Sequence, residues 1–348
     1  MGQTKQEQEL TLLNLNLESV ERDLESLFSI GIQLESIAAL CVEHDDWSSP
    51  TARIAIEHSV TTLGLPCDTV SLEATVSETV DRIIKAIVAV FKRAYEAIAK
   101  WAGALKERLK DIYARIQAYS KEVEGKEPVA VEFKENKHMV ALAIDGGVNL
   151  KLTVRRLQQV VDGLPLIKTS GEKIVYKFNN AKRMADVNAV TALSDDLMDY
   201  ILKHYNMEGK KHVHTSKDSF PGNRRLVLDL TQPVPNFVIL QEEGVEVEKV
   251  SFTAKEISDA IEKLDLENVM KMIDDVEAFA KDLDTTMQKG FSITKGNRDV
   301  AGELLKLAAP INAMLQKPPR TLINYYTKCI AHLEAGLEYA LKQSPDKP

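Results

Sequence analysis

The sequence predicts a mostly α-helical protein with a small α+β insert, in which long amphipathic helices flank a β-containing middle unit. Only 6% of the 348 residues are aromatic, which suits packed helices better than sandwiches or barrels. Apolar residues also recur three and four positions apart over long stretches, as in helices that bury one face. With 44% hydrophobic and 28% charged residues, the chain has the composition of a folded protein.

Charge is distributed unevenly along the chain. Residues 1–73 hold three basic and thirteen acidic residues, a formal charge of −10, whereas residues 74–348 carry +2. Leu10, Leu17 and Leu24 belong to a series of apolar residues at helical spacing in the first part. The sequence therefore predicts an acidic helical leader over 1–73, followed by a nearly neutral body.

The next segment, 74–127, carries the longest regular pattern. Its apolar residues from Val80 to Val123 alternate three and four positions apart over about six heptads. Thr75 and Glu78 have the spacing of a capping box, and Gly125 supplies a stop signal. We expect one amphipathic helix of about forty residues here.

Shorter, β-like runs appear in the middle of the chain and predict an α+β unit over 128–253. Val129–Phe133 and Met139–Ile144 predict a hairpin, and Lys173–Phe178 alternates like a strand after a turn at Thr169–Lys173. A helix is expected over Leu152–Val161. Further strands are expected at Leu226–Leu230, Asn236–Leu240 and Val245–Val250.

Helical periodicity returns in the last part of the chain, 254–343. Thr253 and Glu256 form a second capping box, and Pro318 and Pro319 mark a joint. We therefore expect a helical bundle followed by a tail, 344–348. Its helices are expected at 254–263, 265–289, 297–316 and 319–342.

Motifs for enzyme chemistry are missing from the sequence. The chain has no Walker A loop, dinucleotide fingerprint or nucleophile elbow, and its three cysteines have no metal-ligand spacing. Only His204, His212 and His214 suggest a metal, and no further ligand motif accompanies them. We expect no enzyme activity and no cofactor, with an enzyme site at these histidines in the α+β unit as an alternative.

Basic residues on the long helix suggest contact with nucleic acid. The segment 74–126 has eleven basic and seven acidic residues. Candidate phosphate contacts are Lys92, Arg93, Lys100, Lys106 and Lys110, which can release counterions from DNA. The alternative is an ordinary solvated helix face, because acidic residues are interleaved with them.

Leu-Glu pairs in the leader, as in Leu24-Glu25 and Leu34-Glu35, precede the string Ser71-Leu72-Glu73-Ala74. This combination resembles the internal head proteins of large tailed bacteriophages, whose propeptide a prohead protease removes after a small residue, any residue and Glu. Ala55-Ile56-Glu57 matches that pattern as well. The resemblance implies cleavage after Glu73 and a structural role in the capsid interior.

The same resemblance implies partners and locations. Other virion or capsid-core proteins, packaged DNA and the prohead protease would be partners, and delivery into the host would add a host protein and the host cytoplasm. No apolar run is long enough to span a bilayer. The second interpretation is a cytosolic module in which the heptad face of residues 80–123 binds a helix of a host or phage partner.

Overall fold

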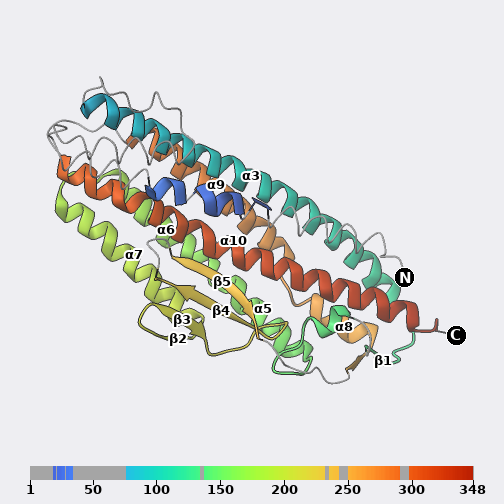
Figure 1. Ribbon diagram of the computed structural model, residues 1–348. Helices are drawn as coiled ribbons and strands as arrows, with labels where there is room; N and C mark the ends of the chain where they lie inside the picture. Colours follow the sequence, from blue (N-terminus) through green and yellow to red (C-terminus); the bar gives the residue numbers. More distant parts are fainter. Residues whose placement is uncertain are drawn as a thin grey trace. The chain divides into compact units, whose positions relative to one another are not determined.

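The computed structural model describes residues 19–20, 22–27, 29–33, 76–133, 137–231, 235–242, 250–290 and 298–347. Within them the chain is mostly helical with a small antiparallel sheet, so the predicted fold class is confirmed (Figure 1). The helices are α3 (Val76–Val123), α4 (Lys137–Val140), α5 (Leu150–Asp162), α6 (Leu164–Asn179), α7 (Met184–His204), α8 (Ala254–Ile261), α9 (Leu266–Gly290) and α10 (Arg298–Gln343). The strands are β1 (Val131–Glu132), β2 (Met207–Lys210), β3 (Val213–Ser216), β4 (Arg224–Asp229), β5 (Asn236–Gln241) and β6 (Ser251–Phe252).

The chain divides into two compact units. Unit 1 lies within Met1–Ala102, Ser170–Asp195 and Glu277–Leu315, and unit 2 lies within Gly103–Thr169, Asp196–Val276 and Gln316–Pro348. Long helices such as α3 and α10 contribute residues to both units. The borders expected at 73, 127, 253 and 343 stay predictions.

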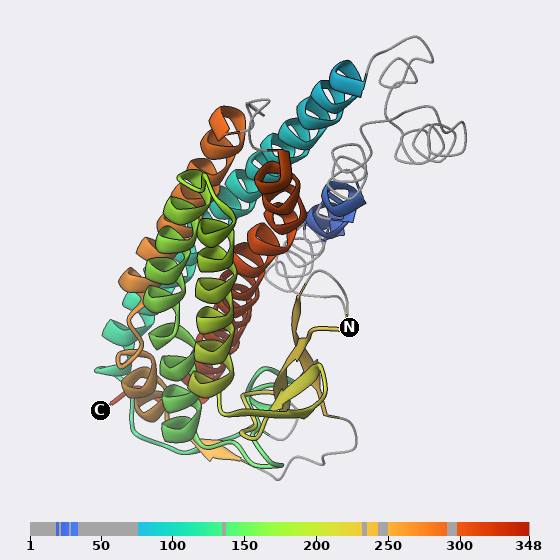
Figure 2. The same ribbon diagram turned by 90° about the vertical axis from the view of Figure 1, so that its left-hand side faces the viewer.

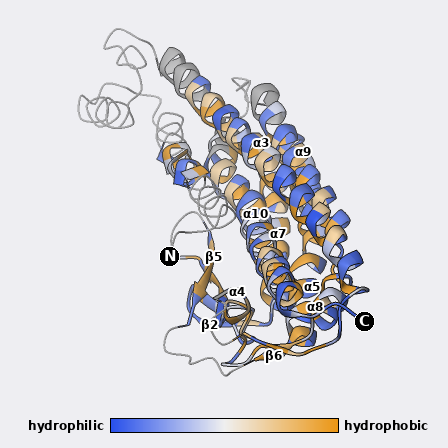
Figure 3. Cartoon of the chain, turned by 90° about the vertical axis from the view of Figure 1, so that its right-hand side faces the viewer, coloured by the Kyte–Doolittle hydropathy of each residue, from blue (hydrophilic) through white to orange (hydrophobic). Residues whose placement is uncertain are grey.

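Helix α3 is the long helix that the heptad pattern predicts, with 48 residues. Its seam residues from Ile87 to Ile116 are at most 3% exposed, whereas the charged residues of the helix lie at the positions between them, so hydrophobic and hydrophilic residues are mixed along α3 (Figure 3). The buried set is Ile87, Phe91, Ala94, Ile98, Trp101, Leu105, Leu109, Ile112 and Ile116. Burial of this stripe, rather than helix propensity alone, holds so long a helix in place.

Helix α10 corrects one sequence expectation. The segments 297–316 and 319–342 are not two helices, because α10 runs through Pro318 and Pro319 without a break. Each internal proline costs about 3 kcal/mol of helix stability. Every residue from 311 to 320 is buried, so packing on all sides offsets that cost. The expected helices 254–263 and 265–289 are confirmed as α8 and α9, and the Thr253–Glu256 capping box is present.

The sheet in unit 2 is a four-stranded antiparallel meander in the order β2-β3-β4-β5 (Figure 1). The runs predicted at 226–230 and 236–240 form β4 and β5, in which Leu228 pairs with Phe237. In the β2–β3 hairpin, a β-carbon on Gly209 would lie 1.9 Å from the carbonyl oxygen of Val213, so glycine is required there. The run predicted at 245–250 lies outside the described residues except for Val250.

The hairpin predicted at 129–144 is wrong. Val131 pairs with Phe252 in the two-stranded sheet β1-β6, and α4 begins where the second strand was expected. The partner strand lies more than one hundred residues farther along the chain, so local alternation could not identify it. The tight turn after Ile144 is present, because the amide of Gly147 donates to the carbonyl of Ile144.

The strand predicted at Lys173–Phe178 is also wrong, because this run is the last part of α6, and the turn expected at Thr169–Lys173 lies inside the same helix. Ile174 and Phe178 are buried one turn apart, which is helical rather than strand spacing. Gly171 lies on the same stripe, where a β-carbon would come 3.0 Å from a ring carbon of Phe279. Figure 2 shows the short turn that joins α6 to α7 in unit 1. The helix predicted at 152–161 is confirmed as α5.

Candidate nucleic-acid face and leader contact

The predicted cleavage segment Ser71, Leu72, Glu73 and Ala74 lies outside the described residues, as does Thr75 of the predicted capping box. Helix α3 begins at Val76, two residues after Ala74. The predicted cut would therefore fall immediately before the long helix. Cleavage after Glu73 stays a prediction.

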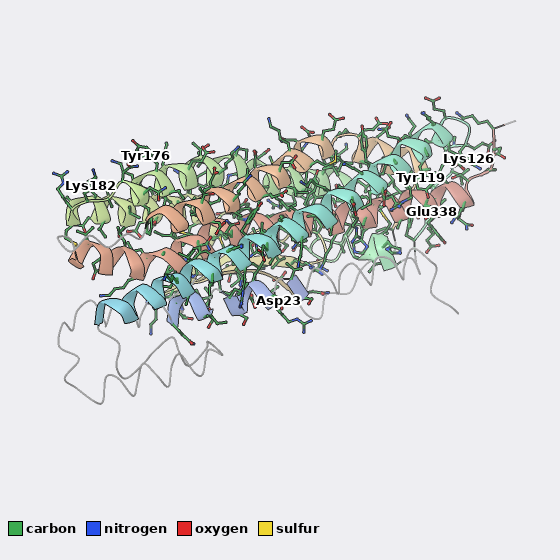
Figure 4. All side chains as sticks on the ribbon, turned by 90° about the horizontal axis from the view of Figure 1, so that it is seen from above. Asp23, Tyr119, Lys126, Tyr176, Lys182 and Glu338 are labelled. Carbon is green, nitrogen blue, oxygen red and sulfur yellow. The ribbon has the colours of Figure 1, made fainter. Side chains whose placement is uncertain are left out.

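Part of the leader is described, and it is helical as predicted. Over residues 19–33, Val20, Leu24, Leu27 and Gly31 share one helical stripe and are buried or half-buried, with Leu24 completely buried. Asp23 is exposed on the other side (Figure 4). The described leader residues thus form an amphipathic helix whose apolar stripe packs against the rest of unit 1.

The neighbours of Gly31 show which helices the apolar stripe of the leader contacts. A β-carbon at Gly31 would lie 3.5 Å from Cβ of Ala309 in α10 and 3.7 Å from Cγ1 of Val90 in α3. All three residues belong to unit 1. The backbone of the leader helix therefore approaches both long helices closely, whereas the charge pattern had suggested only a separate acidic segment.

Four of the five predicted phosphate contacts are at the surface of α3. Lys92, Arg93, Lys100 and Lys110 are exposed, and their side chains lie away from the buried seam. Arg93 and Lys100 are seven positions apart and share one face of the helix. Lys106 differs, because its Nζ lies 2.7 Å from Oδ1 of Asp274 in α9, which offsets its charge.

A second group of charges lies in unit 2, and no sequence pattern indicated it. Nε of Arg115 in α3 donates to Oε1 of Glu334 in α10 at 2.8 Å, and Glu334 is only 4% exposed. Burial lowers the pKa of Arg108 to about 10, with a further contribution from the Arg115 charge, and Glu334 partly opposes this shift. Burial lowers the pKa of Arg115, but the hydrogen bond and charge of Glu334, together with Tyr119 and Asp111, raise this pKa above its ordinary value.

Next to this pair, two histidines are in contact. Nδ1 of His138 in α4 and Nδ1 of His332 in α10 are 3.2 Å apart, so one ring donates and the other accepts. Burial lowers the pKa of His332 to about 4, and the next contributions come from His138 and then from the positive charges of Arg224, Arg108 and Lys328. This part of the core therefore requires a neutral His332.

The three histidines suggested as metal ligands are not brought together as a metal site. His204 ends α7, and its ring nitrogens contact the carbonyl of Gln159 and the hydroxyl of Tyr200, so it fastens α7 to α5. His212 lies in the β2–β3 turn and His214 lies in β3 opposite Leu228. Within the described ranges, no three His, Cys, Asp or Glu side chains are grouped so that they could hold a metal ion.

Cys329 in α10 is buried, and burial raises the pKa of its thiol to about 12. Cys41 and Cys67 lie outside the described residues.

In the portion of the chain that the structure describes, each helix is too short or too polar to cross a bilayer.

Part of the chain matches the profile of a known protein family. The profile of the phiKZ-like phage internal head proteins matches residues 68–333, which is well over half of the chain. No curated protein and no solved structure matches. The matched range begins five residues before Glu73 and ends within α10, so it includes the predicted cleavage segment and the helices from α3 to most of α10, and it leaves out residues 1–67 and 334–348.

Proposed function

Since the chain belongs to the phiKZ-like phage internal head proteins, structural proteins of the virion head, we propose that it lies against the packaged DNA after losing residues 1–73. The single observation that carries this proposal is the coincidence at Glu73. Within a few residues of it, the family match begins, the acidic composition ends and α3 starts. The proposed role needs no bond-breaking chemistry by the protein itself.

Contact with DNA is assigned to the exposed cations of α3. Lys92, Arg93 and Lys100 lie on the surface of unit 1, where their side chains are exposed to solvent. Surface cations of this kind bind the phosphate backbone by releasing condensed counterions, without reading the base sequence. Such binding suits a protein that lies among DNA of any sequence.

The negative charge of the leader supports cleavage before contact with DNA. With a formal charge of −10 on residues 1–73, the uncut chain is repelled by phosphates, whereas residues 74–348 carry +2. Removal of the leader therefore changes the sign of the net charge. Cleavage during head maturation, followed by release of the leader, would convert a chain that DNA repels into one that it retains.

Processing is tested on mature virions by mass spectrometry of the protein recovered from them. We expect a new N-terminus at Ala74 and almost no peptide that spans Glu73 and Ala74. The same peptide at full abundance would remove the cleavage step. A new N-terminus after Glu57 would assign the cut to the second matching string instead.

DNA contact is tested with the triple variant Lys92→Gln, Arg93→Gln and Lys100→Gln. The slope of log affinity against log salt is negative, and each lost phosphate contact reduces its magnitude by about 0.9. On duplex DNA the slope of the triple variant should therefore be smaller in magnitude by roughly 2 to 3. The matched control replaces three exposed lysines that lie outside α3. These are Lys151, Lys263 and Lys281. Equal slopes for the variant and the control would show that α3 does not carry the contact.

A further inference from the structure

The leader helix and the surface beneath it suggest an interaction that outlasts cleavage. We propose that the face of unit 1 around Val90 and Ala309 is a binding surface for the leader helix, which stays bound there as a separate peptide after the chain is cut. This inference rests on the proposed cleavage after Glu73. It differs from that proposal in stating that cutting the chain and losing the leader are two separate events.

The first argument is the depth of the contact. Leu24 is completely buried and Gly31 is buried, while Val20 and Leu27 on the same stripe are half-buried. A segment held only by its covalent connection to α3 would leave this stripe in water. Burial of an apolar stripe is favourable whether or not the peptide bond at Glu73 is intact.

The second argument is the fit between small residues. Gly31 has no side chain at the point where Val90 and Ala309 approach, and a β-carbon there would already be in van der Waals contact. Ala308, next to Ala309, is also completely buried. Small residues at such a point allow helix backbones to approach closely, so the surface accepts a small residue at this position and leaves little room for a longer side chain.

The third argument concerns charge. The buried residues of the leader helix, Leu24 and Gly31, are apolar, whereas Asp23 and Ser26 are exposed. An apolar contact of this kind is insensitive to salt, unlike the proposed DNA contact of α3. Salt therefore separates the two interactions: high salt removes DNA and leaves the leader in place.

Cleavage changes the contact from intramolecular to bimolecular. While the chain is intact, the tether keeps the leader at an effective concentration on the order of millimolar. After the cut, retention depends on the contact alone. The leader would then leave only when its helix is displaced or the cut protein is strongly diluted.

The test uses the full-length chain with the recognition sequence of a site-specific protease inserted between Glu73 and Ala74. The protein is cut completely and passed through a gel-filtration column in about 0.1 M and about 1 M NaCl. We expect leader and body to elute together at both salt concentrations. Separate elution of the wild-type leader would overturn the proposal.

Two variants locate the surface. Gly31→Leu places a side chain against Val90 and Ala309 and should lower the retained leader at least tenfold. Ser29→Leu adds the same side chain at an exposed position and should leave retention unchanged. Equal retention in both variants would show that the leader is held elsewhere. Circular dichroism of the uncut variants shows that the body is folded, and Leu24→Ala provides a second, milder loss of contact.

The engineered site makes this result independent of natural processing. Retention of the leader together with an uncut protein in virions would refute the proposed cleavage and keep the binding surface. Release of the leader together with an Ala74 N-terminus in virions would do the reverse.

Discussion

The buried histidine of α10, His332, should make unit 2 sensitive to acid. Folding lowers the pKa of His332 from 6.5 to about 4, first through burial and then through His138 and the cations Arg224, Arg108 and Lys328. Above pH 6.5 the ring is neutral in both the folded and unfolded chain. Between pH 6.5 and about 4 the unfolded chain takes up a proton that the folded chain does not, so stability falls as the pH falls.

The magnitude follows from the size of the pKa change. At about 1.36 kcal/mol per pH unit, the drop from 6.5 to about 4 sets an upper limit of roughly 3 kcal/mol. His332 keeps some contact with solvent, which lowers the expected loss to roughly 2 kcal/mol. The loss of folding stability should be complete near pH 4 and absent above pH 6.5.

The assay is urea unfolding of the full chain, followed by circular dichroism at several pH values across that window. His332→Gln keeps a polar partner for His138 but cannot be protonated, so its stability should fall by roughly 2 kcal/mol less than that of the wild type. His212→Gln, in the exposed β2–β3 turn, is the control and should behave like the wild type. Parallel pH profiles for wild type and His332→Gln would refute the reasoning.

Two further substitutions test the core of unit 2. Gly209→Ala brings a β-carbon against the Val213 carbonyl and should destabilise the β2–β3 hairpin by about 2 kcal/mol or more, seen as faster hydrogen exchange of its amides; unchanged exchange would contradict this. Glu334→Gln removes the carboxylate beside Arg115 and should cost roughly 2 to 3 kcal/mol in urea unfolding, below the full value for a buried pair because the Arg115 side chain is 36% exposed. The double variant Arg115→Met, Glu334→Leu should recover part of that loss, and strict additivity would show that the two residues are not coupled.

The sequence predicted those elements whose information is local. The stripe from Ile87 to Ile116 and the capping box at Thr253 each lie within one helix, so spacing and residue type were sufficient. The surface position of Lys92, Arg93 and Lys100 also follows from local information, because buried and exposed positions recur at a fixed spacing along a single helix.

Elements that depend on distant residues were missed. Val131 pairs with a strand far along the chain, and α6 was mistaken for a strand because β-branched residues occupy its last turns. Pro318 and Pro319 predict a break only if the surrounding helix is exposed, and here burial outweighs their cost. The Arg115–Glu334 pair and the contact of Gly31 with Ala309 bring together residues more than two hundred positions apart, which no local pattern records.

The buried thiol of Cys329 gives unit 2 a built-in reporter. Because its pKa is about 12, hardly any thiolate forms near neutral pH, and burial keeps alkylating reagents away from the sulfur. A body that has lost residues 1–73 would contain no other cysteine. The rate at which such a protein takes up one label per chain would then measure how often α10 opens, at single-residue resolution and without an engineered probe.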